Sequence, residues 1–319
     1  MKHKWLTMLV VVLVVAAAWP AGGARAAEES ALLGVSVPTL DDPFYTDMVA
    51  GARAMADEMD MTLVVMSADN DAATELENVN ALLEQNVAAL LFSPIDLETS
   101  AEAFLLAASS DVPVIMVGEG AALEDVEGMV AGVVMPDEQL IGSLAAEAIC
   151  DALDGEGVVV EVMDSRDEGV ALERALGFAD YMGEECPDVT LTPFDVQGRE
   201  DRDAFIEAFS AWLKDEDVDG VLILAQDMTL PALEASIIAR MGGLTFVAFD
   251  GSEEALSALK QGRLQWVILP SGWQIGQAGV EMAAKLLAGE EVDAMVLTEP
   301  YVLDLETIMR GDPRSGDLE

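Results

Sequence analysis

Residues 37–48, VPTLDDPFYTDM, follow the first apolar run of the mature sequence and lead into a segment with helical periodicity. This is the order of residues expected where a buried strand ends and a helix begins. Asp42 is a typical N-cap residue, and Pro43 suits the first helical position because an N–H there would have no intrahelical partner. The stretch therefore predicts a strand, a loop and a helix in succession, as in an α/β fold.

Strand-like and helix-like segments alternate along most of the sequence. The strand candidates are LLGVSV, TLVVMSA, AALLFSP, PVIMVG, MVAGVVM, GVVVEVMD, LTPFDV, GVLILA, LTFVAF, LQWVILP and DAMVLT. Most are separated by segments with apolar residues at i, i+3 and i+4, which is a helical spacing. Near-continuous apolar strands between helices predict parallel sheets with both faces covered. About ten strands in roughly 290 residues are too many for one compact domain, so we expect two similar α/β lobes.

The side chains after the first strand form a candidate binding group. Ligands of open parallel sheets bind beyond the carboxyl ends of the strands, which is where Asp42, Phe44 and Tyr45 belong. Aspartate oxygens accept hydrogen bonds from hydroxyls, and aromatic rings stack on the apolar face of a sugar ring. A structural interpretation is equally open, with Asp42 acting only as an N-cap and both aromatic residues in the core. The stretch alone does not decide between them.

The first 26 residues predict a signal peptide. A basic start, KHK, is followed by the apolar run WLTMLVVVLVVAAAW and by a small-x-small motif that ends at Ala26. Cleavage near Ala26–Ala27 leaves a mature chain of about 293 residues in the periplasm. A retained membrane anchor is the alternative, but the apolar run is short for a span. The cleavage site also has no cysteine that could carry a lipid.

Acidic residues dominate the charge of the sequence. The chain has 60 Asp and Glu against 15 Lys and Arg, and three of these basic residues belong to the predicted signal peptide. The mature chain then carries 60 acidic and 12 basic residues, a net charge of −48. Self-repulsion of this size destabilises a compact state, and molar salt screens it. The charge favours a saline medium and argues against nucleic acid or anionic membrane surfaces as partners.

The sequence lacks the residues that most enzyme and metal sites need. Its only histidine, His3, belongs to the predicted signal peptide, so the mature chain has no Ser-His or Cys-His pair. We find no phosphate-binding loop, no G-x-S-x-G motif and no dinucleotide motif. Residues 215–220, DEDVDG, match half of a calcium loop, but the twelfth position is Gln226 instead of glutamate. We therefore expect no enzyme, no cofactor and no metal.

Two cysteines remain in the mature chain. Cys150 and Cys186 each end a predicted helix. An oxidising compartment permits a disulfide between them. Because sequence does not show that the two residues meet, a disulfide and two separate thiols are equally open.

Six segments, in this order along the chain, carry a resemblance to a known family. They are TLDDPFY, ELENVNALLEQNVAALLFSPID, VPVIMVG, ERALGF, FVAFDGSEEAL and QIGQAGVEMAAKLLAGEEV. Over essentially all of the mature sequence, the chain resembles the ribose/galactose type of periplasmic sugar-binding protein that serves ABC transporters. The resemblance implies two Rossmann-like lobes joined by a three-segment hinge, with a ligand between lobes that close over it.

The resemblance also implies an organisation and a function. We expect an N-terminal lobe over residues 30–135 plus 271–296, a C-terminal lobe over 136–270 plus 297–312, and a disordered tail over 313–319. The protein would be a monomer that captures a small polar ligand and delivers it to the membrane permease of an ABC transporter. A periplasmic sensor that docks on a chemoreceptor or a sensor kinase is the alternative.

Several family binding positions have suitable residues in this chain. Asp42, Phe44 and Tyr45 match the polar-then-aromatic group of the first lobe. Asp250 matches the carboxylate of the second lobe that holds sugar hydroxyls. Four further candidates are less direct. Gln226 and Asp227 stand where an Asn-Asp pair is usual, Arg166 could add a donor or be a solvated loop residue, and Trp273 could stack on the ligand or pack between lobes.

Other positions depart from the family pattern. Gly118 and Glu119 stand where ribose-type members have Asp-Arg, Leu172 stands where they have an arginine, and Pro270 stands where a hinge glutamine is common. Two arginines that would hold ring and hydroxyl oxygens are therefore missing. We predict that the ligand is not ribose. A larger or deoxygenated sugar, a polyol, or a cationic ligand would suit Asp42, Glu119 and Asp250 better.

Overall fold

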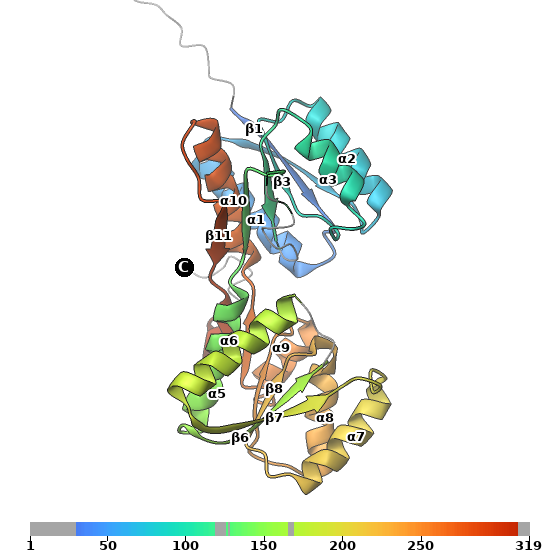
Figure 1. Cartoon of the computed structure of the whole chain (residues 1–319), viewed down its shortest axis with the longest axis vertical. Coiled ribbons are helices and arrows are strands. Elements are labelled where there is room, and N and C mark those ends of the chain that lie inside the picture. The colour runs from blue at the N-terminus through green and yellow to red at the C-terminus, as the bar shows by residue number, and fades with distance from the viewer. Residues whose placement is uncertain (1–29, 119–125, 127, 165–168, 312–319) are drawn as a thin grey trace, which may run out of the picture. The chain divides into compact units, whose positions relative to one another are not determined.

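The computed structural model describes residues 30–118, 126, 128–164 and 169–311 (Figure 1). The predicted signal peptide and the predicted disordered tail lie outside the described residues. Within the described ranges, the helices are too short or too polar to cross a bilayer.

Six parallel strands form the first sheet, in the order β11–β5–β4–β3–β1–β2. The strands are β1 (Leu32–Val37), β2 (Thr62–Ser67), β3 (Ala89–Phe92), β4 (Val114–Val117), β5 (Gly132–Pro136) and β11 (Met295–Thr298). The helices packed on this sheet are α1 (Pro43–Glu58), α2 (Ala72–Glu84), α3 (Ala101–Ala108) and α10 (Gly272–Leu287). Leu33 and Val35 of β1 pack with α1 and α10. Leu90 and Phe92 of β3 pack with α2 and α3, so helices cover both faces of the sheet.

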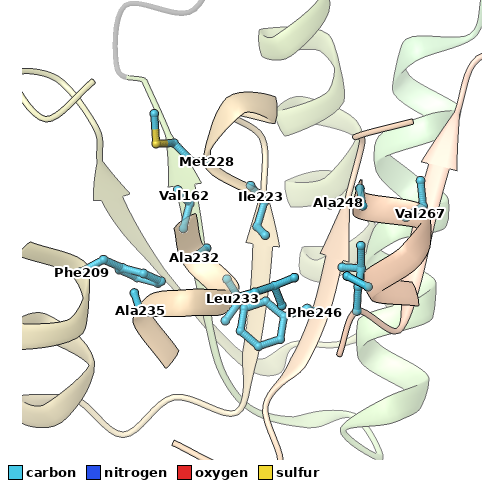
Figure 2. Packing of buried hydrophobic residues seen from close by; sticks show 14 of the residues in the cluster. Val162, Phe209, Ile223, Met228, Ala232, Leu233, Ala235, Phe246, Ala248 and Val267 are labelled. Carbon is cyan, nitrogen blue, oxygen red and sulfur yellow. The ribbon is translucent and has the colours of Figure 1, made fainter. Parts of the chain in front are cut away.

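The second sheet also has six strands, in the order β12–β10–β9–β8–β6–β7. They are β6 (Glu156–Met163), β7 (Asp188–Asp195), β8 (Gly220–Ile223), β9 (Thr245–Ala248), β10 (Trp266–Leu269) and β12 (Tyr301–Leu303), and only β12 runs antiparallel to its neighbour. The helices are α5 (Glu138–Ala152), α6 (Val170–Glu185), α7 (Arg202–Asp215), α8 (Thr229–Ala239), α9 (Glu253–Lys260) and α11 (Leu305–Arg310), with a 3₁₀ turn, η1, at Gln226–Met228. Figure 2 shows side chains from β8, β9, α7 and α8 meeting in the core on one face of this sheet.

The chain passes from one sheet to the other just before helix α5 and just before helix α10. Helix α5 follows β5 of the first sheet but packs on α6 and the second sheet, whereas α10 follows β10 of the second sheet but packs on α1 and the first. Glycines permit the close packing of α5 on α6 and of α10 on α1. A Cβ atom at Gly142 would overlap the carbonyl of Arg174, and one at Gly276 would overlap the carbonyl of Met48. The backbones of each helix pair are therefore in direct contact.

A disulfide joins the two helices that pack on one face of the second sheet. Cys150 in the last turn of α5 is bonded to Cys186, which follows α6, with a Cα–Cα distance of 6.3 Å. Of the two alternatives left open by the sequence, the structure contains the bonded pair.

The predicted fold class is confirmed, with two α/β sheets that are parallel apart from β12. The eleven strand candidates correspond to β1 to β11, and the sequence interpretation missed β12. This strand has only three residues, of which Val302 is exposed, so it lacks the apolar run that marked the others. The residue boundaries of the two lobes stay a prediction.

Candidate functional site

The loop after β1 has the structure that its sequence indicates. Asp42 is the N-cap of α1, and its Oδ1 accepts a hydrogen bond from the backbone N–H of Phe44 at 2.8 Å. Pro43 is the first helical residue. The Asp42 side chain is nevertheless exposed, so its capping bond leaves it in contact with solvent beyond the end of the strand.

A cavity of about 750 Å³ lies at this loop. Its wall includes residues from the carboxyl ends of strands in both sheets. From the first sheet these are Thr39, Asp41, Asp42, Pro43, Phe44, Tyr45, Asp47 and Asn70, and from the second they are Arg174, Gln226, Phe249, Gly251, Ser252, Glu253, Leu269 and Pro270. Four of the predicted site residues thus line one cavity: Asp42, Phe44, Tyr45 and Gln226.

A second cavity of about 410 Å³ adjoins the first and shares Gln226 and Ser252 with it. Asp227 and Asp250 line this second cavity. Asp250 is buried, and its Oδ1 accepts a hydrogen bond from the backbone N–H of Ser252 at 2.9 Å, which fixes the carboxylate.

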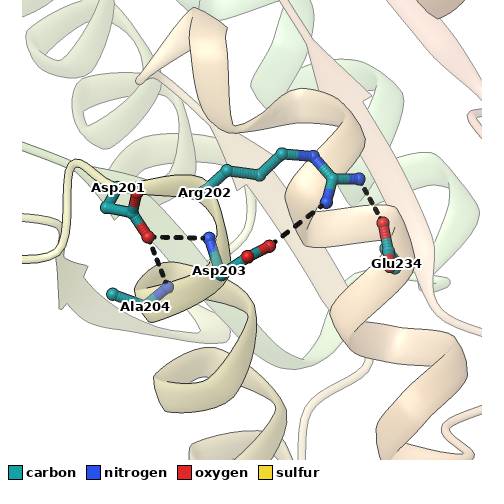
Figure 3. Close-up of polar contacts among 5 residues, drawn as sticks. All are labelled: Asp201, Arg202, Asp203, Ala204 and Glu234. Carbon is teal, nitrogen blue, oxygen red and sulfur yellow. Dashed lines mark hydrogen bonds and ion pairs between the residues drawn. The ribbon is translucent and has the colours of Figure 1, made fainter.

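Arg202 is a positively charged residue in the wall of the second cavity, and acidic neighbours balance its charge. It forms ion pairs with Asp203 at 3.7 Å and with Glu234 (Figure 3). Asp201 caps the same helix, with Oδ1 accepting from the N–H groups of Asp203 and Ala204, each at 3.1 Å. The Arg202 guanidinium is therefore paired with carboxylates of α7 and α8.

The two aromatic residues pack on the core and also lie in the cavity wall, so the structure is compatible with both alternatives that the sequence left open. Phe44 and Tyr45 form an edge-to-face pair, with ring centroids 5.1 Å apart. They are half-buried against the core of the first sheet and also line the cavity. Core packing therefore holds two aromatic surfaces at the site.

The remaining predicted residues have different outcomes. Glu119 and Arg166 lie outside the described residues. Trp273 is half-buried, does not line either cavity, and donates its backbone N–H to Asp47 Oδ2 at 2.8 Å. Gly118, beside Glu119, has φ of +106°, and a Cβ there would lie 2.9 Å from Ser93 Oγ. The positive φ and the close approach of Ser93 both favour glycine at this position.

Among the residues of the first cavity wall that sequence reasoning missed, two are buried and charged, Asp47 and Arg174. Asp47 is buried in α1 and accepts hydrogen bonds from the Trp273 N–H and from the hydroxyl of Tyr301 at 3.2 Å. It therefore links α1 to the start of α10 and to β12. It lies five residues after Asp42 in the first predicted helix, and no sequence signal marked it as a cavity residue.

Arg174 is the second missed residue. Its Nε donates to Glu138 Oε2 at 2.6 Å, and its guanidinium lies 5.2 Å from the ring centre of Phe249. Burial raises the pKa of the Glu138 carboxyl, and the charge of Arg174 opposes that rise. The sequence showed Arg174 only as part of the ERALGF motif, which does not reveal the direction of its side chain.

The described residues do not assemble a metal centre. No group of three or more His, Cys, Asp or Glu side chains in this part of the chain is placed to hold a metal ion. Within the calcium-like sequence, Asp219 Oδ2 accepts a hydrogen bond from the Val158 N–H at 2.9 Å, which is a structural use of the carboxylate. The wall of the first cavity combines carboxylates, two amides, aromatic rings and one guanidinium, which suit reversible binding of a polar molecule.

Comparison with known proteins gives the family. A family model described as a periplasmic binding protein domain matches residues 33–291. The ribose import binding protein RbsB of Salmonella typhimurium is 30% identical over 312 residues, covering 97% of this chain and 100% of that protein. The xylitol-binding protein of Mycolicibacterium smegmatis is 29% identical over 274 residues, covering 85% of this chain and 76% of that protein.

A solved structure supports the same fold. AraP, an arabinose binding protein from Geobacillus stearothermophilus, matches with a TM-score of 0.76 at 17% identity, covering 88% of this chain and 98% of that one. These similar proteins are binding proteins and not enzymes, as the sequence predicted for this chain. The chain belongs to the type I periplasmic binding proteins, the family that its sequence motifs resemble.

Proposed function

We propose that this chain captures a neutral sugar or polyol other than ribose and delivers it to the permease of an ABC transporter. One observation carries the proposal: Asp42, Phe44 and Tyr45, from the start of one helix, line a single cavity together with Gln226. Carboxylate and amide groups bind hydroxyls, and aromatic faces cover the C–H face of a sugar ring. The wall of this cavity is rich in polar side chains, which suits a ligand with several hydroxyl groups.

The adjoining cavity extends the polar wall. Asp250 is held in place by the Ser252 N–H, and Asp227 lies on the same wall. A carboxylate that is already oriented loses little entropy when it accepts a ligand hydroxyl. The relatives named for ribose and for xylitol support the same ligand class, sugars and polyols. The RbsB relative is named as an import binding protein, which favours transport over the sensor alternative.

The departures from the family pattern support a ligand other than ribose. Leu172, which stands where a family arginine is expected, is exposed and does not line either cavity. Pro270 replaces a glutamine in the wall of the first cavity and has no side-chain donor. A ligand that made bidentate hydrogen bonds to those positions in other members would lose them here.

We further propose that binding is coupled to closure of the two predicted lobes. The chain passes between the sheets after β5, β10 and β11, which gives three connections about which the lobes could rotate. Closure would bury the ligand and present both lobes to the permease, so the permease would recognise the closed state. Export to a saline periplasm follows from the signal-peptide pattern and the net charge of the sequence.

Calorimetry on the purified mature chain tests the proposal. Ribose, D-allose, xylitol and myo-inositol would be titrated in about 2 M salt, where the Debye length is about 3 Å or less. We expect a neutral probe other than ribose to bind, and Asp42→Ala and Asp250→Ala each to weaken it by about ten-fold or more. Asp180→Ala, an exposed change on α6 outside both cavity walls, is the control.

Two results would contradict the proposal in different ways. Tight ribose binding would overturn the exclusion of ribose and leave the ligand class standing. If no neutral probe bound, or if both aspartate variants bound like the control, the site assignment itself would be wrong.

A further inference from the structure

We propose that the hydrogen bond from the Tyr301 hydroxyl to Asp47, here called the hinge brace, favours the arrangement of the two lobes in this structure over a closed one and thereby lowers ligand affinity. The inference rests on the proposed coupling of binding to closure and deepens it. Tyr301 lines neither cavity, so it acts on affinity without touching the ligand. It is a positioning residue for binding, and sequence reasoning did not mark it.

Asp47 accepts hydrogen bonds from two segments that arrive from different strands. The residue lies in α1, on the first sheet, and is 6% exposed. Its Oδ2 accepts from the backbone N–H of Trp273 at 2.8 Å and from the hydroxyl of Tyr301 at 3.2 Å. Trp273 is in the first turn of α10, just after the chain leaves β10, and Tyr301 begins β12, just after the chain leaves β11. One carboxylate oxygen therefore contacts the chain just beyond two of the three connections between the sheets.

Tyr301 is fixed to the second sheet by its backbone and by its ring. Strand β12 pairs with β10, and Tyr301 lies opposite Leu269 in this pair. The ring is half-buried and packs against the core of the second sheet that contains Phe246 and Leu303. Helix α1, which carries Asp47, packs instead on the core of the first sheet. The hinge brace therefore joins one lobe to the other, and a rotation of the lobes changes its length.

The size of the first cavity indicates which arrangement the hinge brace favours. One sugar ring fills only part of a cavity of about 750 Å³. Small-molecule sites bury most of the surface of their ligand, so closure has to bring the two walls of this cavity nearer to each other. That rotation moves β12 relative to α1. Because the bond is already 3.2 Å long, a small further displacement breaks it.

Loss of the bond on closure gives the hinge brace an effect on affinity. A hydrogen bond to a charged group contributes more to stability than one between neutral groups, and this one forms in the open arrangement only. The apparent affinity of a ligand falls with the fraction of protein in the form that binds it. The hinge brace therefore weakens binding and returns the lobes to the open arrangement when the ligand leaves.

The test compares two substitutions of tyrosine by phenylalanine. Tyr301→Phe removes the hydroxyl and keeps the ring that packs on the core. Tyr181→Phe removes a hydroxyl from a half-buried ring on α6, outside both cavity walls, and is the control. The radius of gyration of each ligand-free chain would be measured by small-angle X-ray scattering in about 2 M salt. The affinities for D-allose, xylitol and myo-inositol would then be measured by calorimetry, beside the melting temperature of each chain.

We expect ligand-free Tyr301→Phe to have a smaller radius of gyration than the wild type and the control. It should bind the tightest of the three probes about three- to ten-fold more tightly than they do, as for loss of one hydrogen bond from the open form. When saturated with that probe, all three chains should have the same radius of gyration. A purely structural role of the hydroxyl would lower the melting temperature and leave these two quantities unchanged.

Other results separate the inference from the proposed function. If a probe binds the wild type but Tyr301→Phe binds it equally or more weakly, the inference is overturned and the proposed function stands. If no probe binds any of the three chains, the proposed function fails, and the ligand-free scattering still decides the inference. An unchanged radius of gyration in Tyr301→Phe would overturn it.

A second variant decides the case in which Tyr301→Phe does not fold. Asp47→Asn keeps the size of the side chain and an acceptor oxygen, but it removes the charge that strengthens the hinge brace. Because Asp47 lines the first cavity, only the ligand-free measurement is used for this variant. We expect its radius of gyration to be smaller than that of the wild type, and an equal or larger value would overturn the inference.

Discussion

The first sheet, β11–β5–β4–β3–β1–β2, and the second, β12–β10–β9–β8–β6–β7, place corresponding strands in the same order. In both, a pair of helices crosses at glycines, α1 with α10 and α5 with α6. The second sheet differs by its disulfide and by four aromatic rings in mutual contact: Phe194, Phe205, Phe209 and Trp212. In the first sheet, Phe44 and Tyr45 line the cavity instead. Aromatic packing is thus concentrated in the core of the second sheet, whereas two aromatic residues of the first sheet lie in the cavity wall, to which the second sheet contributes Phe249.

The largest effect should come from the aromatic core of the second sheet. Phe209 is fully buried and lies 4.8 Å from Phe194 and 5.3 Å from Phe205 between ring centres. We expect Phe209→Ala to lower the free energy of unfolding by about 3–5 kcal/mol in urea titrations. Phe92→Ala, in the first sheet, is the matched change, because Phe92 is equally buried but has one ring neighbour at 6.2 Å. It should cost about 1 kcal/mol less, and equal costs would contradict the comparison.

The disulfide should contribute the next largest effect. It closes a loop with a sequence separation of 36, for which the chain-entropy model gives about 3–4 kcal/mol. Reductant should therefore lower the urea midpoint of the wild type and have no effect on Cys150→Ser/Cys186→Ser. Ligand affinity should be the same in both proteins, because neither cysteine lines the cavity. A midpoint that does not respond to reductant would show that the bond contributes nothing.

The helix crossings should respond alike in the two halves. Gly142→Ala and Gly276→Ala each place a methyl group against backbone of the facing helix, and we expect each to cost about 1–3 kcal/mol. Gly183→Ala, on α6 with no atom within 4 Å of the added Cβ, is the control. It should stabilise the protein by about 0.5–1 kcal/mol through helix propensity. A cost at only one of the two crossings would argue against their equivalence.

The smallest effect concerns two buried glutamates. Burial raises the pKa of Glu75 in the first sheet and of Glu138 in the second, but only Glu138 has an ion-pair partner. A raised pKa means that the folded state binds the proton more tightly than the unfolded state does. Glu75 therefore adds stability at low pH that is lost as pH rises through its folded pKa. Proton binding that is tenfold tighter in the folded state corresponds to about 1.4 kcal/mol of stability.

The variant Glu75→Gln isolates this contribution. The stability of wild type relative to Glu75→Gln should rise as pH is lowered from about 7.5 to about 4.5, measured by urea unfolding in about 2 M salt. The same comparison of wild type with Asp180→Ala corrects for the effect of losing one negative charge at an exposed position. A wild-type advantage that fell with decreasing pH would have the wrong sign for a raised pKa.

The sequence was sufficient for features set by local chemistry. The N-cap at Asp42 and the parallel sheets follow from capping and from apolar periodicity, which act over a few residues. The sequence was insufficient where distant segments meet. Arg174 lies in the cavity wall because Glu138 and Phe249 hold its side chain there. Asp47 lies in the same wall, where its carboxylate is held by Tyr301 and by the start of α10. Such contacts depend on tertiary packing, which periodicity does not encode. Strand β12 was missed because its three residues are too few to show a periodic pattern.

The most direct test of the central claim is to identify what the protein binds in its own cell. The mature chain would be purified natively in high salt and denatured, and the released small molecules would be identified by mass spectrometry. A neutral sugar or polyol other than ribose, near one per chain and absent from Asp42→Ala purified in the same way, is the predicted result. Release of an amine or another non-sugar compound at that ratio would contradict the account.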